Sequence, residues 1–179
     1  KSAAMAAFLP GVGDIDLFFV NLVRDPRAIA YSQMRTKSLP SGQTSALSGA
    51  LTQTYPPHRS ARQWVQRQLV AELILKRHPR RRRMVLRYED LVADPQGSVD
   101  RLRLMLGLSA EPLPFIDADT LDMTPTHTVG GNPSRVRTGP TPLRLDDEWR
   151  TEMPPKARAT ATIITAPLLR RYGYHVDGR

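Results

Sequence analysis

Apolar residues form a nearly continuous run from Ile15 to Val23, and β-branched and aromatic side chains are frequent in it. Such a run is typical of a strand that is buried on both faces of a parallel sheet. A helix start follows directly, because Asp25 can cap a helix and Pro26 suits the first helical position, which needs no hydrogen-bond donor. The pattern therefore predicts a strand followed at once by a helix.

The same order recurs later in the chain. Residues Met84–Tyr88 form a second short apolar run, and residues 96–106 have apolar positions at helical spacing that end at Gly107, as helices often do. Two further helices are predicted over residues 59–76 and 154–169. Strands that alternate with helices favour an α/β fold with a parallel sheet flanked by helices.

Arg24 stands at the end of the first predicted strand. In open α/β sheets ligands bind beyond the carboxyl ends of the strands, where a helix N-terminus presents free N–H groups to a phosphate. The planar guanidinium adds a permanent charge, and Ser32, seven residues after Asp25, returns to the helix face of the cap. These residues predict an anion-binding corner. The alternative is an arginine paired with a neighbouring carboxylate and a serine that faces solvent.

This stretch resembles the 3′-phosphate-binding element of sulfotransferases that use 3′-phosphoadenosine 5′-phosphosulfate (PAPS). The resemblance implies that Arg24 and Ser32 bind the 3′-phosphate. The segment Tyr88-Glu89-Asp90-Leu91 is similar to the family segment whose tyrosine contacts the adenine, which implies that role for Tyr88. Alternatively, Tyr88 is a half-buried ring at the rim of the sheet. The family's fold would be a sheet like that of P-loop NTPases, in a single domain over residues 1–179.

A glycine-rich loop with two arginines spans residues 130–139. Glycines let the backbone approach a ligand closely, and arginines supply positive charge. The loop is similar to the late basic loop of the family, in a form closer to bacterial and carbohydrate-type relatives, and Asp147-Glu148-Trp149 resembles the acidic-tryptophan pair that follows it. The residues implied in cofactor binding are Gly131, Asn132, Arg135 and Arg137. Which arginine faces the phosphate stays open, and a solvated surface loop is the alternative.

The family's 5′-phosphosulfate loop should lie before the Arg24 strand, but only fourteen residues precede Ile15, and none match G-x-x-x-x-G-K-[ST]. We therefore expect this chain to be the carboxyl-terminal portion of a larger protein, with the first strand-loop-helix missing.

The catalytic residues are less fully specified by the resemblance. Animal cytosolic relatives have a lysine-threonine-histidine run upstream of the strand-end arginine, and Lys1 falls in the place of the lysine. Ala3 stands where the histidine would be and cannot accept a proton, so we expect the general base outside this chain. His127 is the candidate within the chain, and its alternative is a surface histidine in a loop.

Composition limits the partners and the compartment. A net charge of +9 and a pI near 10.6 favour an anionic partner. The chain has no cysteine, no long apolar run and no metal-ligand cluster, so we expect no disulfide, no metal and a cytoplasmic location. A membrane anchor in a missing N-terminal segment is the alternative. The composition alone does not identify an activity.

Two segments remain outside these motifs. Residues 38–57 are polar and rich in proline and glycine, which predicts a flexible insertion of the kind that often covers acceptor sites. The run His78-Pro79-Arg80-Arg81-Arg82-Arg83 indicates either a surface for nucleic acid or another acidic partner, or a solvated connection between a helix and a strand.

The motifs together predict a PAPS-dependent sulfotransferase that transfers a sulfuryl group to a hydroxyl or amine of a small-molecule or carbohydrate acceptor. One alternative is a nucleotide phosphotransferase of the P-loop type, but it would need a P-loop lysine and magnesium ligands that the chain does not show. The other is a basic nucleic-acid-binding module, which predicts aromatics among the arginines, whereas aromatic content is 6%. No nucleic-acid partner is therefore expected.

Overall fold

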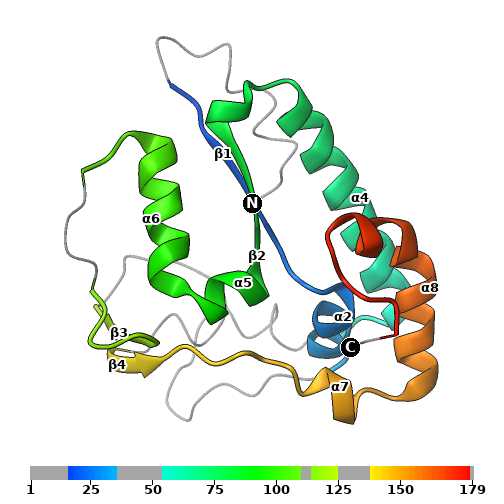
Figure 1. Cartoon of the computed structure of the whole chain (residues 1–179). Coiled ribbons are helices and arrows are strands. Elements are labelled where there is room, and N and C mark those ends of the chain that lie inside the picture. Colours follow the sequence, from blue (N-terminus) through cyan, green and yellow to red (C-terminus); the bar gives the residue numbers. More distant parts are fainter. Residues whose placement is uncertain (1–15, 36–53, 110–113, 125–137, 178–179) are drawn as a thin grey trace.

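The structure is a computed structural model that describes residues 16–35, 54–109, 114–124 and 138–177. Figure 1 shows β1 and β2 between two groups of helices, with α2, α4 and α8 on one side and α5 and α6 on the other. This mixed arrangement confirms the predicted α/β fold class. The elements in chain order are β1 (Phe19–Val23), α2 (Pro26–Met34), α4 (Pro57–Lys76), the 3₁₀ helix η2 (Arg80–Arg82), β2 (Arg83–Arg87), α5 (Tyr88–Ala93), α6 (Pro95–Leu106), β3 (Thr120–Met123), β4 (Gly139–Pro142), α7 (Trp149–Glu152) and α8 (Pro155–Arg171).

β1 and β2 are parallel neighbours, in a register that runs from Phe19 opposite Arg83 to Val23 opposite Arg87. Parallel strands need a crossover connection, and α2, α4 and η2 lie between the two strands in the chain. Both strands therefore end at the same edge of the sheet, which is the lower edge in Figure 1.

The prediction of a strand buried on both faces is wrong for β1. Val20 is 46% exposed and Leu22 is 51% exposed, whereas Val23 is fully buried. Alternate side chains of a strand point to opposite faces. Asn21 and Val23 face α4, where Asn21 donates a hydrogen bond to Gln68 at 2.9 Å. Among the described residues, no element fully covers the other face of β1.

Most of the buried core lies where α2, α4 and α8 pack together. Small side chains let these helices approach closely, and the aromatic side chains fill the remaining space. Trp64 is buried, as the sequence predicts. One cluster comprises Ala28, Ala30, Ala61, Trp149, Met153, Ala157 and Ala161, and a second comprises Val23, Trp64, Leu168, Leu169 and Tyr174.

Local capping accounts for several helix ends. The Asp25 carboxylate accepts a hydrogen bond from the Arg27 backbone N–H at 2.8 Å and caps α2, with Pro26 next to it as predicted. Asp94 caps α6 in the same way. Gly107 ends α6 with a φ of 68°, a left-handed conformation that glycine adopts without strain. The sequence therefore located the start of α2 and the end of α6 correctly.

β3 and β4 form an antiparallel pair that the sequence pattern did not predict, with Thr120 opposite Pro142 and Met123 opposite Gly139. Residues 124–138 separate the two strands in the chain, and residues 125–137 of this segment lie outside the described ranges. β4 leads into the segment that returns toward the end of β1.

Candidate functional site

The Arg24 guanidinium lies at the carboxyl end of β1, between an acidic group and an aromatic ring. Its Nη2 atom is 2.7 Å from Oδ2 of Asp146, and its Cζ atom lies 4.7 Å from the centroid of the Tyr88 ring. The predicted meeting of Arg24 and Tyr88 at one sheet edge is thus confirmed. The alternative prediction, pairing with a carboxylate, also holds in this structure, because Asp146 is the partner.

The protein satisfies the donors of Arg24 only in part. Nη2 also donates to the backbone carbonyl of Asp146 at 3.2 Å, but the buried Nε atom has no hydrogen-bond partner among the described residues. An unpaired buried donor costs free energy. The backbone of Arg24 is better fixed, because the Trp64 indole donates to its carbonyl at 3.1 Å. The site therefore holds a positioned guanidinium with an unused donor.

Tyr88 is the first residue of α5 and directly follows β2. Its hydroxyl is 3.5 Å from the Arg144 carbonyl, at the limit of hydrogen bonding, so the hydroxyl is weakly held. The ring itself is held against Arg24. A flat aromatic face beside a cation at a sheet edge is suited to stacking with a planar ring of a ligand.

Two backbone N–H groups at the N-terminus of α2 already have partners within the protein. Glu89 accepts a hydrogen bond from the Asp25 backbone N–H at 3.1 Å, and the Asp25 side chain accepts the one from Arg27. Pro26 has no N–H to offer. An anion at this corner would therefore depend largely on side chains such as that of Arg24.

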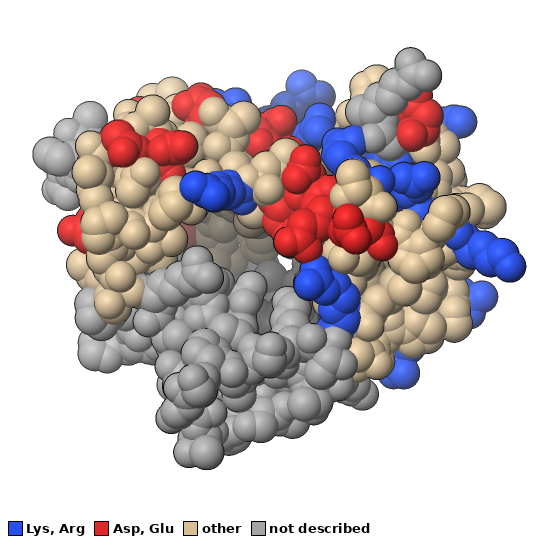
Figure 2. Space-filling model, turned by 90° about the horizontal axis from the view of Figure 1, so that it is seen from below, with Lys and Arg blue, Asp and Glu red and all other residues tan. Residues whose placement is uncertain are grey.

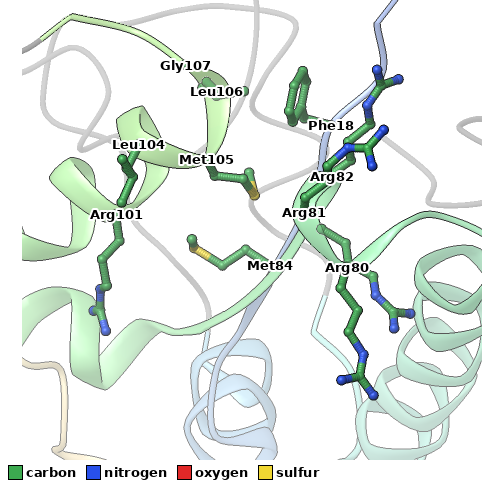
Figure 3. A pocket seen from close by; sticks show the side chains of 11 residues that line it. Phe18, Arg80, Arg81, Arg82, Met84, Arg101, Leu104, Met105, Leu106 and Gly107 are labelled. Atoms are coloured by element: carbon green, nitrogen blue, oxygen red, sulfur yellow. The ribbon is translucent and has the colours of Figure 1, made fainter.

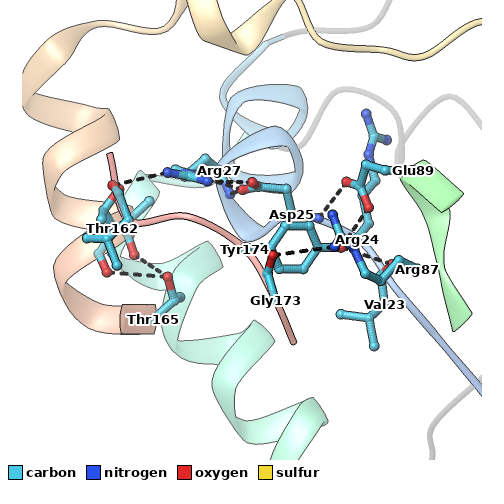
Figure 4. Close-up of polar contacts among 12 residues, drawn as sticks. Val23, Arg24, Asp25, Arg27, Arg87, Glu89, Thr162, Thr165, Gly173 and Tyr174 are labelled. Carbon is cyan, nitrogen blue, oxygen red and sulfur yellow. Dashed lines mark hydrogen bonds and ion pairs between the residues drawn. The ribbon is translucent and has the colours of Figure 1, made fainter. Parts of the chain in front are cut away.

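Arg27 forms a buried ion pair with Asp25. Its Nε and Nη2 atoms lie 2.9 and 2.7 Å from the two oxygens of the Asp25 carboxylate, and both side chains are almost completely buried. The guanidinium also lies over the Trp149 ring, 4.5 Å from the centroid. Figure 4 shows this two-point contact. Arg27 therefore has a structural position, whereas Arg24, three residues earlier, faces the sheet edge.

Glu89 connects three segments behind Arg24. One carboxylate oxygen accepts from the Asp25 N–H, and the other accepts from the Tyr174 hydroxyl at 2.6 Å (Figure 4). Burial raises the pKa of Tyr174 well above its usual range, and the hydrogen bond to Glu89 raises this pKa further. The Tyr174 hydroxyl also lies 3.3 Å from the Val23 carbonyl, so these contacts fix the end of β1.

Acidic residues from the segment before α7 complete this edge. Besides the contact of Asp146 with Arg24, Glu148 pairs with Arg35 at 2.5 Å, and this contact raises the pKa of Arg35. Both carboxylates are largely exposed, whereas Trp149, which follows, is buried. In Figure 2 acidic side chains gather beside basic ones on the face seen from below, where the strands end.

Comparison with known proteins identifies the family. The model of the sulfotransferase family (Sulfotransfer_3) matches residues 16–112, more than half of the chain and including β1, α2, β2 and α6. The chain belongs to the sulfotransferase family. A search among curated proteins found no significant match.

A solved structure supports the fold of this sulfotransferase-family chain. A sulfotransferase domain from the curacin biosynthetic pathway superposes with a TM-score of 0.53 at 20% sequence identity. The match covers 88% of this chain and 54% of the other, so the chain spans about half the length of that domain. At this identity the likeness establishes the fold, a parallel sheet of the P-loop-like type with flanking helices.

Ser32 lies on α2 of this sulfotransferase-family chain and is partly buried. Seven residues separate it from Asp25, which corresponds to about 10 Å along a helix axis. A phosphate is too small to contact both the start of α2 and Ser32. The long side chain of Arg24 is therefore the group that can share a ligand with Ser32, and this role of Ser32 stays a prediction.

Several predicted site residues lie outside the described residues and stay predictions. The set comprises the catalytic candidates Lys1 and His127 and the loop residues Gly131, Asn132, Arg135 and Arg137. Most of the predicted insertion over residues 38–57 also lies outside, since description resumes at residue 54.

Within the described ranges, no three histidine or acidic side chains come close enough to hold a metal ion. None of the helices in the same ranges combines the length and the apolar character needed to cross a bilayer.

Sequence reasoning missed four residues that shape this edge. Asp146 was not singled out, and Arg27, Glu89 and Tyr174 were not recognised as buried or bridging groups. For Arg27 the available signal was its position two residues after Asp25, within reach of that carboxylate. The others approach from far along the chain, so local patterns do not reveal them.

Proposed function

We propose that the protein transfers a sulfuryl group from PAPS to a hydroxyl or amine of a small-molecule or carbohydrate acceptor. Membership of the sulfotransferase family supports the reaction class. The juxtaposition of Arg24 and Tyr88 at the carboxyl edge of the sheet is the observation that supports the donor.

In this proposal Arg24 binds the 3′-phosphate of the donor. A guanidinium offers a planar set of donors that matches phosphate oxygens, and the side chain of Arg24 is partly exposed at the sheet edge. A bound phosphate would replace the Asp146 carboxylate at Nη2. Since that ion pair is partly exposed, displacing it costs little.

Tyr88 would bind the adenine. Its ring lies beside Arg24, so one ligand with an aromatic base and a phosphate can contact both residues. Ser32 would add a hydroxyl to the phosphate, and Gly131, Asn132, Arg135 and Arg137 would close the site from the segment between β3 and β4. These further assignments rest on the sequence motifs.

Sulfuryl transfer needs a base that takes the proton of the acceptor and positive charge that stabilises the leaving phosphate. The resemblance implies a general base outside these residues; within them, His127 is the candidate base and Lys1 the candidate catalytic lysine. Arg24 would contribute by holding the nucleotide, because positioning is a large part of catalysis in group transfer.

The proposal is tested by calorimetric titration of the intact protein with 3′-phosphoadenosine 5′-phosphate and with adenosine 5′-phosphate at one fixed salt concentration. We expect the 3′-phosphate to raise affinity by at least about tenfold, in line with charge-assisted hydrogen bonds. Arg24→Lys keeps the charge but loses the fork of donors, so it should lose most of this preference.

Arg62→Lys is the matched control, since Arg62 is exposed on α4 and lies outside the site. It should bind both nucleotides like the unchanged protein. Equal weak binding of the two nucleotides, reduced alike by salt, would contradict the proposal and indicate a general anion-binding surface.

A further inference from the structure

A shallow cavity of about 670 Å³, wide open to solvent, lies at the opposite end of β1 and β2 from Arg24. Figure 3 shows it between α6 and the start of β2, with Met84 and Met105 facing each other across it. Cavities of this size are typical of small-molecule sites. The lining residues are Phe18, Arg80, Arg81, Arg82, Arg83, Met84, Arg101, Leu104, Met105, Leu106 and Gly107.

The side of this cavity formed by α6 and Met84 is mainly apolar. Met84 and Met105 are flexible, polarisable side chains that adapt to apolar ligands of different shapes. Leu104 and Leu106, both on α6, are 83% and 40% exposed at the rim. An exposed apolar wall beside a cavity is a feature of binding grooves.

One side of the cavity is strongly basic. Arg80, Arg81 and Arg82 form η2, and Figure 3 shows their guanidinium groups spread out on this side, away from the methionines. Arg82 pairs with Asp16 at 2.7 Å. The side chains of Arg80 and Arg81 form no hydrogen bond or ion pair with any described residue.

We propose that this cavity binds an anionic amphiphile, a single apolar chain that ends in a phosphate, sulfate or carboxylate group. The apolar chain would lie between Met84 and Met105, and the charged head would reach Arg80 and Arg81 at the basic side. Charge complementarity favours this occupant, because a neutral apolar ligand would leave the unpaired arginines unused. The site is separate from the Arg24 corner and does not depend on the proposed sulfuryl transfer.

The test is NMR of the intact protein with ¹³C-labelled methionine methyl groups. Octyl phosphate, below its critical micelle concentration, is the probe, and Met84→Leu and Met105→Leu assign the two resonances. We expect both resonances to shift saturably, while that of Met153, buried in the helical core, stays unchanged. Octyl phosphate should bind at least about tenfold more tightly than inorganic phosphate and than neutral octyl glucoside.

Two variants separate the roles of head and tail. The double variant Arg80→Gln/Arg81→Gln should weaken octyl phosphate binding at least about fivefold. Leu104→Ser should weaken octyl phosphate binding while leaving the weak binding of inorganic phosphate unchanged. The matched control is Arg62→Gln/Arg67→Gln, which removes the same charge from the exposed face of α4 and should leave the titration unchanged.

Three results would overturn the proposal. Equal affinity for inorganic and octyl phosphate would indicate a simple anion site, and equal affinity for octyl glucoside would indicate an apolar site without a role for the arginines. Vesicles of phosphatidylglycerol and of phosphatidylcholine distinguish the third case. Binding to the anionic vesicles with no shift of Met84 and Met105 by octyl phosphate would indicate docking on a membrane surface.

Discussion

The Nη2 atom of Arg24 lies 2.7 Å from the Oδ2 atom of Asp146, across 122 positions of sequence. An internal carboxylate thus occupies the position where the proposed nucleotide would place a phosphate oxygen. Asp146 is about half exposed, so this ion pair is weak enough to exchange with a ligand. Asp146 is therefore a competitor of the phosphate in the proposed function.

Asp146→Asn removes that competition. We expect it to raise the affinity for 3′-phosphoadenosine 5′-phosphate by up to about fivefold, since an exposed ion pair contributes at most about 1 kcal/mol. Calorimetric titration measures the change, with Asp147→Asn as the control for a neighbouring exposed carboxylate. Weaker binding by Asp146→Asn would show instead that Asp146 orients Arg24 for the ligand.

The Asp25–Arg27 pair should be a large contributor to stability when one partner is removed. Asp25→Asn leaves the buried charge of Arg27 uncompensated, so we expect a loss of about 3 kcal/mol in the free energy of unfolding. Asp25→Ala also removes the cap of α2 and should cost about 1 kcal/mol more. Urea denaturation gives both values. Glu148→Ala breaks an exposed pair and serves as the control, and a loss as large as that of Asp25→Asn would refute the argument.

The ring of Tyr88 should matter more than its hydroxyl. Tyr88→Phe keeps the aromatic face over Arg24, and its hydroxyl contact is only marginal, so affinity for 3′-phosphoadenosine 5′-phosphate should change by less than about twofold. Tyr88→Leu removes the cation–π contact and the stacking surface and should lower affinity by about fivefold or more. Equal losses in the two variants, measured by titration, would assign the contribution to the hydroxyl instead.

Stability should fall at alkaline pH because of buried Tyr174 and partly buried Tyr172. Burial raises the pKa of Tyr174 and, with the nearby Glu72 carboxylate, that of Tyr172 above the ordinary value of 10. Above about pH 10 the unfolded chain releases these protons while the folded protein keeps them, so the free energy of unfolding decreases as pH rises. Below that pH the two tyrosines contribute no slope.

Tyr174→Phe checks this assignment. It removes one of the two titrating groups, so the decrease in unfolding free energy between pH 9 and 11 should be shallower than in the unchanged protein. Urea denaturation across this range provides the comparison. Tyr31→Phe is the control, because it leaves Tyr172 and Tyr174 in place. Parallel pH curves for the unchanged protein and Tyr174→Phe would rule out the proposed linkage.

Much of the local structure could be predicted from residue patterns. Asp25 with Pro26 located the start of α2, and Gly107 located the end of α6, because capping and left-handed glycine act over a few residues. The meeting of Arg24 and Tyr88 followed from one topological rule, since parallel strands end at the same edge. The pairing of β3 with β4 was not predicted, because strands of four residues have too few positions for a clear alternation.

By itself, the sequence determined which chemical groups stand at the ends of its strands and helices, and with them the family. Only the tertiary structure decided which of these groups are buried, paired or open. Arg24 and Arg27 are alike in type and three residues apart. Arg27 is enclosed by Asp25 and Trp149, whereas Arg24 is partly exposed and its Nε has no partner among the described residues. The physical reason is that burial and pairing depend on Asp146, Trp149 and Tyr174, which reach this edge only when the end of the chain packs against its beginning.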